Sequence, residues 1–584
     1  MAGLRMLRRL PGRYLATAAG VAMGRTLSEE WRASDPHRWL TGHPRPEGFA
    51  LQPEDRRPMD AEAGRLILSG TFALADATMT VGVGGNPWDR ACPTRDLADA
   101  LHSFAWLPDL VAVGPDGAAE ALRLVLEWRR LFGRWNRFAW EPSIMARRVF
   151  NLACAGPTLT ARASDAETLL IAADLARQAR DLLGPADIAG AADRAVAAAV
   201  AGVALSGSAG ERLLARALAK LSKALPRTVA QDGGHASRQP SAALELLFDL
   251  ETLDEAMVQR GLAAPDAVQR AIDRLAAAVR FFTLADGSLA VGHGGVARDA
   301  TYVAAVRAQD EAGDRTMPSE LGGYQRMESS RLQVIADTAP PPAGSWSLSG
   351  AASPLAMQVL AGGRRLIDLD AGRSLDAAST VQVEGRDLSR PITGLAARIL
   401  GARLADLDAV VEVQRHEAPG AVWLDLAHRG WNRRYGLMHQ RRLYLDLEAG
   451  DLRGEDRLTP TARAQGPDSR HFVAYTLRFQ LHPGVRALVA QDRRSVLLRA
   501  DGVQEGWVLR NDVLDITIEP ARRAGRPALQ LVLSGLRRAD SGARVRWRLS
   551  PARIPQAMPP PPLMRRADLI DDASSRVDGL QREA

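Results

Sequence analysis

The chain has 584 residues, of which 46% are hydrophobic and 24% charged, and this balance excludes a generally disordered protein. The length exceeds what one hydrophobic core supports and predicts two or three domains. The formal net charge of +7 comes almost entirely from arginine, since Lys220 and Lys223 are the only lysines. Arginine forks bind carboxylate, sulfate and phosphate groups, so the composition favours an acidic ligand.

The cysteine content and the N-terminal sequence give information about the cellular compartment of the protein. Cys92 and Cys154 are the only cysteines, which excludes a disulfide framework and a cysteine-ligated zinc site. Basic residues precede an apolar stretch at 14–23, as in a signal peptide, but Arg13 adjoins that stretch and no clear cleavage site follows. Export and retention in the cytoplasm therefore both stay open. No segment is long enough and free enough of charge to predict a transmembrane helix.

The first part of the chain is predicted to be an irregular arm and then a helical domain. We expect residues 1–93 to form the arm, because glycine and proline are scattered through 26–85. From residue 94 apolar side chains recur at helical spacing and alanine is abundant. Helices are expected at 97–101, 118–132, 142–155, 163–183, 186–206, 209–225, 254–262 and 265–284. Joined by short turns, they predict an α/α toroid or helical solenoid over residues 94–310.

One polar loop, residues 232–241, interrupts the helical sequence. Two glycines free its backbone, Pro240 stops the preceding helix, and Ser241 is expected to cap the next one. The loop therefore presents His235 and its polar neighbours between two helices. The simpler alternative is an ordinary helix connection whose histidine bonds a backbone carbonyl.

Past residue 322, the spacing of apolar residues changes from the helical period to the alternation that is typical of strands. Short alternating segments lie at 332–337, 355–360, 365–369, 410–413, 423–428, 443–447, 472–479, 495–499, 514–518 and 529–533. They predict a large antiparallel β-sandwich over residues 311–555, followed by a flexible, proline-rich tail at 556–584. The predicted fold class is therefore α+β and multidomain, a helical toroid followed by a β-sandwich.

Six short sequence motifs occur along these two predicted domains. They are SFAWLPDL (103–110), AWEP (139–142) with Arg147 and Arg148, DGGHASRQP (232–240), GYQR (323–326), GLMHQRRLY (436–444) and LRGEDRL (452–458). Together with the predicted architecture, they make the chain resemble the heparinase II/III family of polysaccharide lyases. The resemblance implies β-elimination at a uronic acid. In that reaction a base removes the proton α to the carboxylate, a donor neutralises the carboxylate, and an acid assists the leaving oxygen.

Carried onto this chain, the resemblance implies a set of site residues. His235 or Tyr324 is the expected catalytic acid/base, with Gln239 or Arg238 on the carboxylate. Trp140 is the expected stacking platform, although Trp140 and Tyr324 can equally be core aromatics. The remaining expected substrate-binding residues are Glu141, Ser237, Arg326, His439 and Arg441. No cofactor is implied, and a groove at the domain junction is expected to hold the 232–241 loop and Tyr324.

The sequence also departs from the family pattern. Gln239 stands where relatives tend to have asparagine, and no tyrosine follows it. Relatives have histidines where this chain has the 350–354 segment, including Ala351, and Ala378. An alanine methyl can neither accept a proton nor bind a metal, and three convergent ligands are not visible, so no metal site is predicted.

The hairpin after Gly436 carries a second expectation. Strand alternation places His439 and Arg441 on one face and Gln440 and Arg442 on the other, with an arginine directed at Glu455 or Asp456.

Three functional hypotheses follow. The first is a lyase acting on an acidic, uronate-containing polysaccharide. The second is a catalytically degenerate protein that binds a glycan or scaffolds envelope polysaccharide, and the third is a protein-interaction solenoid without a glycan ligand. No nucleic-acid partner is predicted, because no nucleic-acid motif accompanies the arginine clusters. The resemblance implies the periplasm or cell envelope, and the cytoplasm is the alternative if the N-terminal segment is not a signal.

Overall fold

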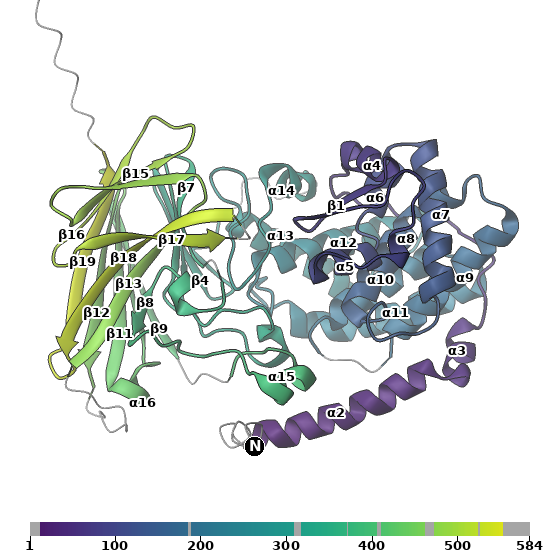
Figure 1. The fold of residues 1–584 in the computed structure, drawn as a ribbon, viewed down its shortest axis with the longest axis horizontal. Helices are drawn as coiled ribbons and strands as arrows, with labels where there is room; N and C mark the ends of the chain where they lie inside the picture. Colours follow the sequence, from purple (N-terminus) through teal and green to yellow (C-terminus); the bar gives the residue numbers. More distant parts are fainter. Residues whose placement is uncertain are drawn as a thin grey trace, which may run out of the picture.

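The fold consists of a helical domain followed by a β-sandwich domain, which lie side by side (Figure 1). The structure, a computed structural model, describes residues 12–184, 188–308, 317–370, 372–405, 410–461, 472–523 and 526–552. Helices followed by two large antiparallel sheets confirm the predicted fold class. The predicted tail at 556–584 lies outside the described residues.

The helical domain is built from α4 to α14. Their bounds are α4 Ala61–Leu68, α5 Arg95–His102, α6 Leu107–Ala112, α7 Pro115–Phe132, α8 Pro142–Thr160, α9 Asp165–Leu182, α10 Ala191–Ala204, α11 Gly207–Thr228, α12 Pro240–Gln259, α13 Asp266–Phe282 and α14 Ala300–Arg307. A hairpin of β1 Thr71–Leu74 and β2 Ala77–Thr80 follows α4.

Helix α10 lies at the centre of this domain and contacts α8, α9, α11 and α12. It is composed almost entirely of alanine and valine, and nearly all of its side chains are buried. A helix that is apolar all round must be enclosed on every side. Small side chains also let the neighbouring helices approach closely: a Cβ added to Gly202 would lie 2.6 Å from the backbone nitrogen of Leu214. The small, apolar side chains of α10 therefore explain why this helix lies at the centre of the domain.

Helix α12 differs from the prediction at both of its ends. It runs without a break through residue 254, where a new helix was predicted to begin. Its N-cap is Gln239 rather than Ser241, and Pro240 occupies the first turn, where a missing N–H has no consequence. The hydroxyl of Ser241 instead accepts a hydrogen bond from the Val296 backbone (3.0 Å).

The N-terminal segment is not the irregular arm that the sequence predicted. It contains helix α2 (Gly12–Ala33) and helix α3 (Asp35–Gly42) before the extended stretch that leads to α4. Helix α2 runs below the helical domain, from α3 at one end to α15 (Gly394–Leu400) of the β-domain at the other (Figure 1). Ala18 packs there with Ile392, Ala396 and Leu400. Contact with both domains stabilises a helix that local sequence alone did not indicate.

The sandwich has two antiparallel sheets. The eight-stranded sheet has the order β14-β15-β16-β19-β12-β11-β10-β9, and the other has the order β17-β18-β13-β7-β6-β5-β4-β3, with β8 paired to β13. The strands are β3 Glu320–Leu321, β4 Tyr324–Glu328, β5 Leu332–Asp337, β6 Met357–Ala361, β7 Arg364–Asp368, β8 Val381–Val383, β9 Val411–Ala418, β10 Ala421–His428, β11 Leu437–Asp446, β12 Asp451–Pro460, β13 Phe472–Leu481, β14 Val485–Val489, β15 Ser495–Ala500, β16 Trp507–Asn511, β17 Ile516–Arg523, β18 Arg526–Arg538 and β19 Ala543–Pro551. A short helix, α16 (Asn432–Tyr435), joins β10 to β11.

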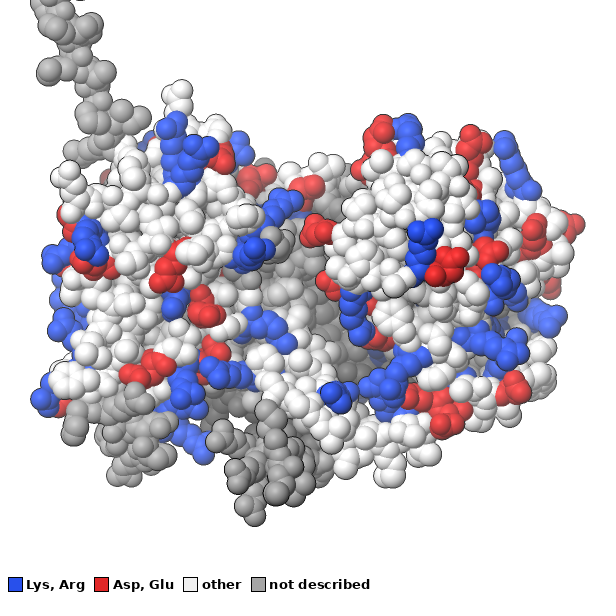
Figure 2. Space-filling view, viewed as in Figure 1, with Lys and Arg blue, Asp and Glu red and all other residues white. Residues whose placement is uncertain are grey.

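One face of the molecule carries charged side chains on both domains and is hollowed between them (Figure 2). Figure 2 shows basic and acidic side chains interspersed over both domains, with a recess separating them. No helix within the described ranges combines the length and the apolarity that crossing a bilayer requires.

Candidate functional site

The 232–239 loop lies at the junction of the two domains. It follows α11, and an antiparallel backbone β-bridge between Val229 and His235 closes it. The carboxylate of Asp232 accepts hydrogen bonds from the backbone of Gly234 (2.9 Å) and from Gly322 of the β-domain (2.8 Å). A Cβ on Gly234 would lie 2.6 Å from the Cα of Gly322, so only glycine permits this approach. The loop glycines therefore serve the contact between domains.

Arg238 fastens the loop to the β-domain. Its backbone is left-handed (φ +58), and its side chain is only 10% exposed. The guanidinium donates to the Asp337 carboxylate (2.7 Å) and to four backbone carbonyls, those of Gly322, Gly323, Ala339 and Pro340. Each guanidinium nitrogen thus has a partner within the protein. The resemblance assigned this arginine to a substrate carboxylate, but the structure gives it a carboxylate of the chain itself.

Tyr324 stands beside Arg238 and is buried. Its hydroxyl donates to the backbone carbonyl of Arg238 (2.8 Å), and its ring lies against the Arg238 guanidinium (4.7 Å) and edge-on to Phe282 (5.2 Å). Burial raises the pKa of Tyr324 well above its ordinary value, so the hydroxyl stays protonated. In this conformation the hydroxyl is buried and already has a hydrogen-bond partner within the protein.

His235 is buried in the same junction. Its Nδ1 lies 2.7 Å from the Ser237 hydroxyl, and its ring meets Trp346 of the β-domain edge-on (5.5 Å). Burial lowers the pKa of His235 to about 4, so its imidazole is neutral at neutral pH. Gln239 is also engaged, since its amide donates to the His293 carbonyl (2.8 Å) and to the Ser349 hydroxyl.

The structure adds a buried histidine and two carboxylates that sequence reasoning missed. His293 has its Nε2 3.1 Å from Asp337, and its backbone N–H donates to Asp370 (3.0 Å). Burial raises the pKa of Asp370 to about 6. The backbone of Asp370 forms an antiparallel β-bridge with Ala378, which is one of the two positions where a family histidine was expected. The signal in the sequence was a histidine surrounded by three glycines, Gly292, Gly294 and Gly295.

The sandwich interior contains a second group of buried polar residues, linked in a row by hydrogen bonds. Gly430 N–H donates to His428 Nδ1 (3.1 Å), His428 Nε2 lies 3.3 Å from His439 Nδ1, and His439 Nε2 lies 2.9 Å from Asp456. This order makes both rings neutral with the proton on Nε2. Burial alone would raise the pKa of Asp456, but the Arg441 charge and the His439 hydrogen bond hold it well below its usual range.

The predicted hairpin geometry is confirmed. Along β11, His439 and Arg441 are buried while Gln440 and Arg442 face outward. Arg441 donates to Asp456 (2.8 Å) and to the backbone carbonyls of Leu355 and Ser379. His439 and Arg441 therefore lie buried inside the sandwich. In the part of the chain that the structure describes, no three His, Cys, Asp or Glu side chains are grouped as they would be around a metal ion.

The remaining predicted residues lie apart from the junction loop or are structural. Trp140 is 3% exposed, donates to the Phe132 carbonyl (2.9 Å) and lies under Arg177 (4.6 Å), so it is a core aromatic. Glu141 is the N-cap of α8 and pairs with Arg95 (3.1 Å). Arg326 is buried and donates to the carbonyls of Phe281 and Thr283, at the end of α13.

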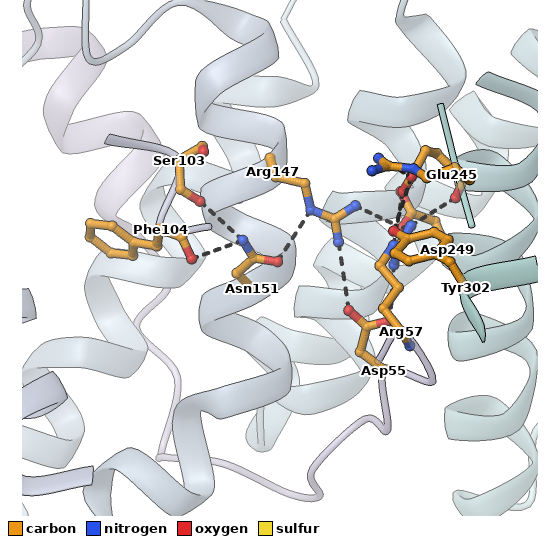
Figure 3. Close-up of polar contacts among 10 residues, drawn as sticks. Asp55, Arg57, Ser103, Phe104, Arg147, Asn151, Glu245, Asp249 and Tyr302 are labelled. Carbon is orange, nitrogen blue, oxygen red and sulfur yellow. Dashed lines mark hydrogen bonds and ion pairs between the residues drawn. The ribbon is translucent and has the colours of Figure 1, made fainter. Parts of the chain in front are cut away.

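A charged cluster, which sequence reasoning also missed, joins the N-terminal segment to the helical domain (Figure 3). Arg57 donates to Asp55 (2.9 Å), Glu245 (2.9 Å) and Asp249 (2.7 Å), and Arg147 donates to the same oxygen of Asp249 (3.0 Å). Burial alone would raise the pKa of Glu245, but the surrounding arginines lower it to about 2. The residues preceding α4 are thereby anchored on α8 and α12.

Comparisons with known proteins agree with this architecture. The family model "Heparinase II/III-like, C-terminal" matches residues 317–548. FtsZ-localized protein C of Caulobacter vibrioides (strain NA1000 / CB15N) is 46% identical over 573 residues, which cover 94% of this chain and 98% of that protein.

Two solved structures share the fold at low sequence identity. Heparinase III aligns with a TM-score of 0.68 and 13% identity, covering 90% of this chain and 91% of that one. The heparan sulfate lyase HepC from Pedobacter heparinus aligns with a TM-score of 0.53 and 14% identity, covering 89% and 88%.

Proposed function

The chain belongs to the heparinase II/III-like family, and from this premise we propose that it is a catalytically degenerate member that binds an acidic glycan as a scaffold. The observation that carries the proposal is the hydrogen bond from the Tyr324 hydroxyl to the Arg238 carbonyl. It engages the expected catalytic tyrosine in a contact between the two domains.

The chemistry of elimination explains why this contact matters. The base must reach the proton α to the uronate carboxylate, and a donor must neutralise that carboxylate. Here Tyr324 and His235 are buried, and the Arg238 guanidinium is occupied by Asp337 and backbone carbonyls. Alanines 351 and 378, both buried, offer no replacement. These features support loss of the family reaction, while the arginine-rich composition supports attraction to an acidic polymer.

The decisive experiment incubates the purified chain with heparan sulfate, alginate and other uronate polymers, with heparinase III as positive control. Elimination creates a conjugated, unsaturated sugar that absorbs in the ultraviolet. We expect no such absorbance, together with binding of at least one polymer that weakens as salt is added. Turnover that His235→Ala abolishes would restore the lyase hypothesis. Failure to bind any glycan at any salt concentration would favour the third hypothesis, a protein-interaction solenoid without a glycan ligand.

A second proposal concerns location. We propose that the chain gathers where FtsZ is located, and the support is its 46% identity, over 94% of its length, with a protein named for FtsZ localisation. A fluorescent fusion imaged together with labelled FtsZ is expected to coincide with it. A fusion that stays evenly distributed while FtsZ is assembled would exclude this location.

A further inference from the structure

The outward face of the eight-stranded sheet carries a continuous row of side chains across six strands. In register, His416 of β9 lies opposite Trp423 of β10, and Trp423 lies opposite Tyr444 of β11. The row continues through Arg453 of β12, Arg548 of β19 and Arg510 of β16. From β10 to β16, the residues before and after each member of the row are buried or half-buried, so the row faces solvent. This surface belongs to the sheet that does not contain Tyr324 or Asp337.

A cavity of about 1010 Å³ lies over the arginine half of this row. Among the described residues that line it, arginines outnumber carboxylates two to one. The arginines are Arg331, Arg442, Arg453, Arg510, Arg546 and Arg548, and the carboxylates are Asp451, Glu455 and Asp512. The volume is that of a large ligand pocket. Carboxylates beside the lining pair with two of these arginines, Asp425 with Arg442 (2.5 Å) and Glu505 with Arg331 (2.8 Å). The positive excess is therefore concentrated at Arg510, whose guanidinium donates to the Ser495 hydroxyl (3.0 Å), and it favours an anionic group there.

The carboxylates of the cavity already have partners in the protein. Asp451 is fully buried and pairs with Arg548 and with Arg453 (3.3 Å), and Glu455 pairs with Arg546 (2.9 Å). The side chains of Arg453, Arg546 and Arg548 are nevertheless about half exposed. A guanidinium has five N–H donors in a planar fork, so each can bind an incoming carboxylate as well.

The aromatic end of the row distinguishes a peptide from a sugar. Trp423 is stacked between His416 (5.1 Å, 15°) and Tyr444 (6.1 Å, 27°), and the Arg453 guanidinium lies over Tyr444 (5.4 Å) from the following strand. The ring faces that would stack on a sugar are therefore covered by neighbouring side chains. Val508, Ala449 and Pro551 add apolar surface to the lining. We propose that this face binds an acidic peptide segment of a partner protein, with glutamate or aspartate carboxylates on the arginines.

The test measures fluorescence anisotropy of a short, fluorescein-labelled peptide rich in glutamate and leucine, added to the full chain. The double variant Arg510→Gln, Arg546→Gln should weaken binding about tenfold or more, because each change removes a charge that faces the cavity. The matched control is Arg486→Gln, an exposed arginine on β14 of the same sheet that does not line the cavity. It should bind as the unmodified chain does. Circular dichroism spectra and Tm should agree for all variants, since the three arginines are exposed.

Two comparison ligands complete the test: the same peptide with glutamine in place of glutamate, and an alginate oligosaccharide. We expect neither to bind at the cavity. The proposal is overturned if the glutamine peptide binds equally well, if Arg486→Gln weakens binding as much as the double variant, or if no peptide binds. An oligosaccharide that competes and loses affinity in the double variant would reassign the surface to a glycan. These outcomes are separate from glycan binding elsewhere on the chain, which the double variant should leave unchanged.

Discussion

The hydroxyl of Tyr324 donates a hydrogen bond of 2.8 Å to the backbone carbonyl of Arg238, and the Arg238 guanidinium lies 4.7 Å from the centre of the Tyr324 ring. The two residues are 86 positions apart and belong to different domains. Through this contact, the start of the β-sandwich is fixed to the loop that precedes α12. The side chain that the resemblance makes a candidate for acid–base chemistry thus contributes a contact between the two domains.

Tyr324→Phe tests this structural role. The change removes the donor and leaves the Arg238 carbonyl without it, so we expect the free energy of unfolding to fall by about 1–2 kcal/mol. Tyr444→Phe, on the outward sheet face, should change it by less than about 0.5 kcal/mol. Urea unfolding measures both. If Tyr324→Phe instead left stability unchanged and reduced turnover of a uronate polymer, Tyr324 would be catalytic.

Two adjacent arginines of β11 should differ sharply in their contribution to stability. The Arg441 side chain is 0% exposed and pairs with Asp456, whereas Arg442 is 57% exposed and pairs with Asp425. Arg441→Met leaves a buried carboxylate without its cation and should cost about 3–5 kcal/mol. Arg442→Met should cost less than about 1 kcal/mol, because solvent screens the pair. Equal losses in denaturant unfolding would contradict the buried arrangement.

The buried His235 should make stability depend on pH. Its folded pKa of about 4 lies below the ordinary 6.5, so the unfolded chain binds more protons between these values. Stability should therefore fall as the pH drops from 6.5 towards 4, by up to ~3 kcal/mol from this residue. His235→Asn keeps an acceptor near Ser237 but cannot titrate, so the slope of unfolding free energy against pH should decrease.

The most informative range is pH 6.5 to 4.5, since Glu245 adds its own loss only below its ordinary pKa of 4.5. His102 provides a comparison, because burial also lowers its pKa to about 4. His102→Asn should reduce the slope by a similar amount, and the double variant should reduce it further. An unchanged slope in His235→Asn would show that its imidazole is hydrated.

The charged cluster in Figure 3 predicts that the N-terminal segment is essential for the stability of the helical domain. Arg57→Met would remove the cation that Asp55, Glu245 and Asp249 share. Because Arg147 still pairs with Asp249 and Arg298 with Glu245, the change should cost about 2–3 kcal/mol, less than a buried carboxylate left with no cation. The neighbouring Arg56 pairs with Glu255 (2.7 Å), and both are more than a quarter exposed. Arg56→Met should cost less than about 1 kcal/mol. Thermal unfolding and limited proteolysis before α4 check this difference, and equal behaviour of the two variants would refute it.

The sequence by itself was sufficient where structure depends on local period and composition. Helical spacing and alanine content indicated the helical domain, and alternation indicated the sandwich, because neighbours along one element determine those patterns. The same alternation correctly placed Arg441 inward and Arg442 outward. It could not predict α2, whose Ala18 packs against Ala396 and Leu400 of α15, far later in the chain.

Only the tertiary structure decided what the junction residues do. His235, Arg238 and Tyr324 have polar side chains that suit catalysis, and the phrases around them resemble a lyase. Whether such groups face a substrate or one another depends on partners such as Asp337, which lies 99 positions from Arg238. The row from His416 to Arg510 likewise exists only once six strands are in register. Burial and long-range pairing are set by how the elements pack, and no local pattern encodes them.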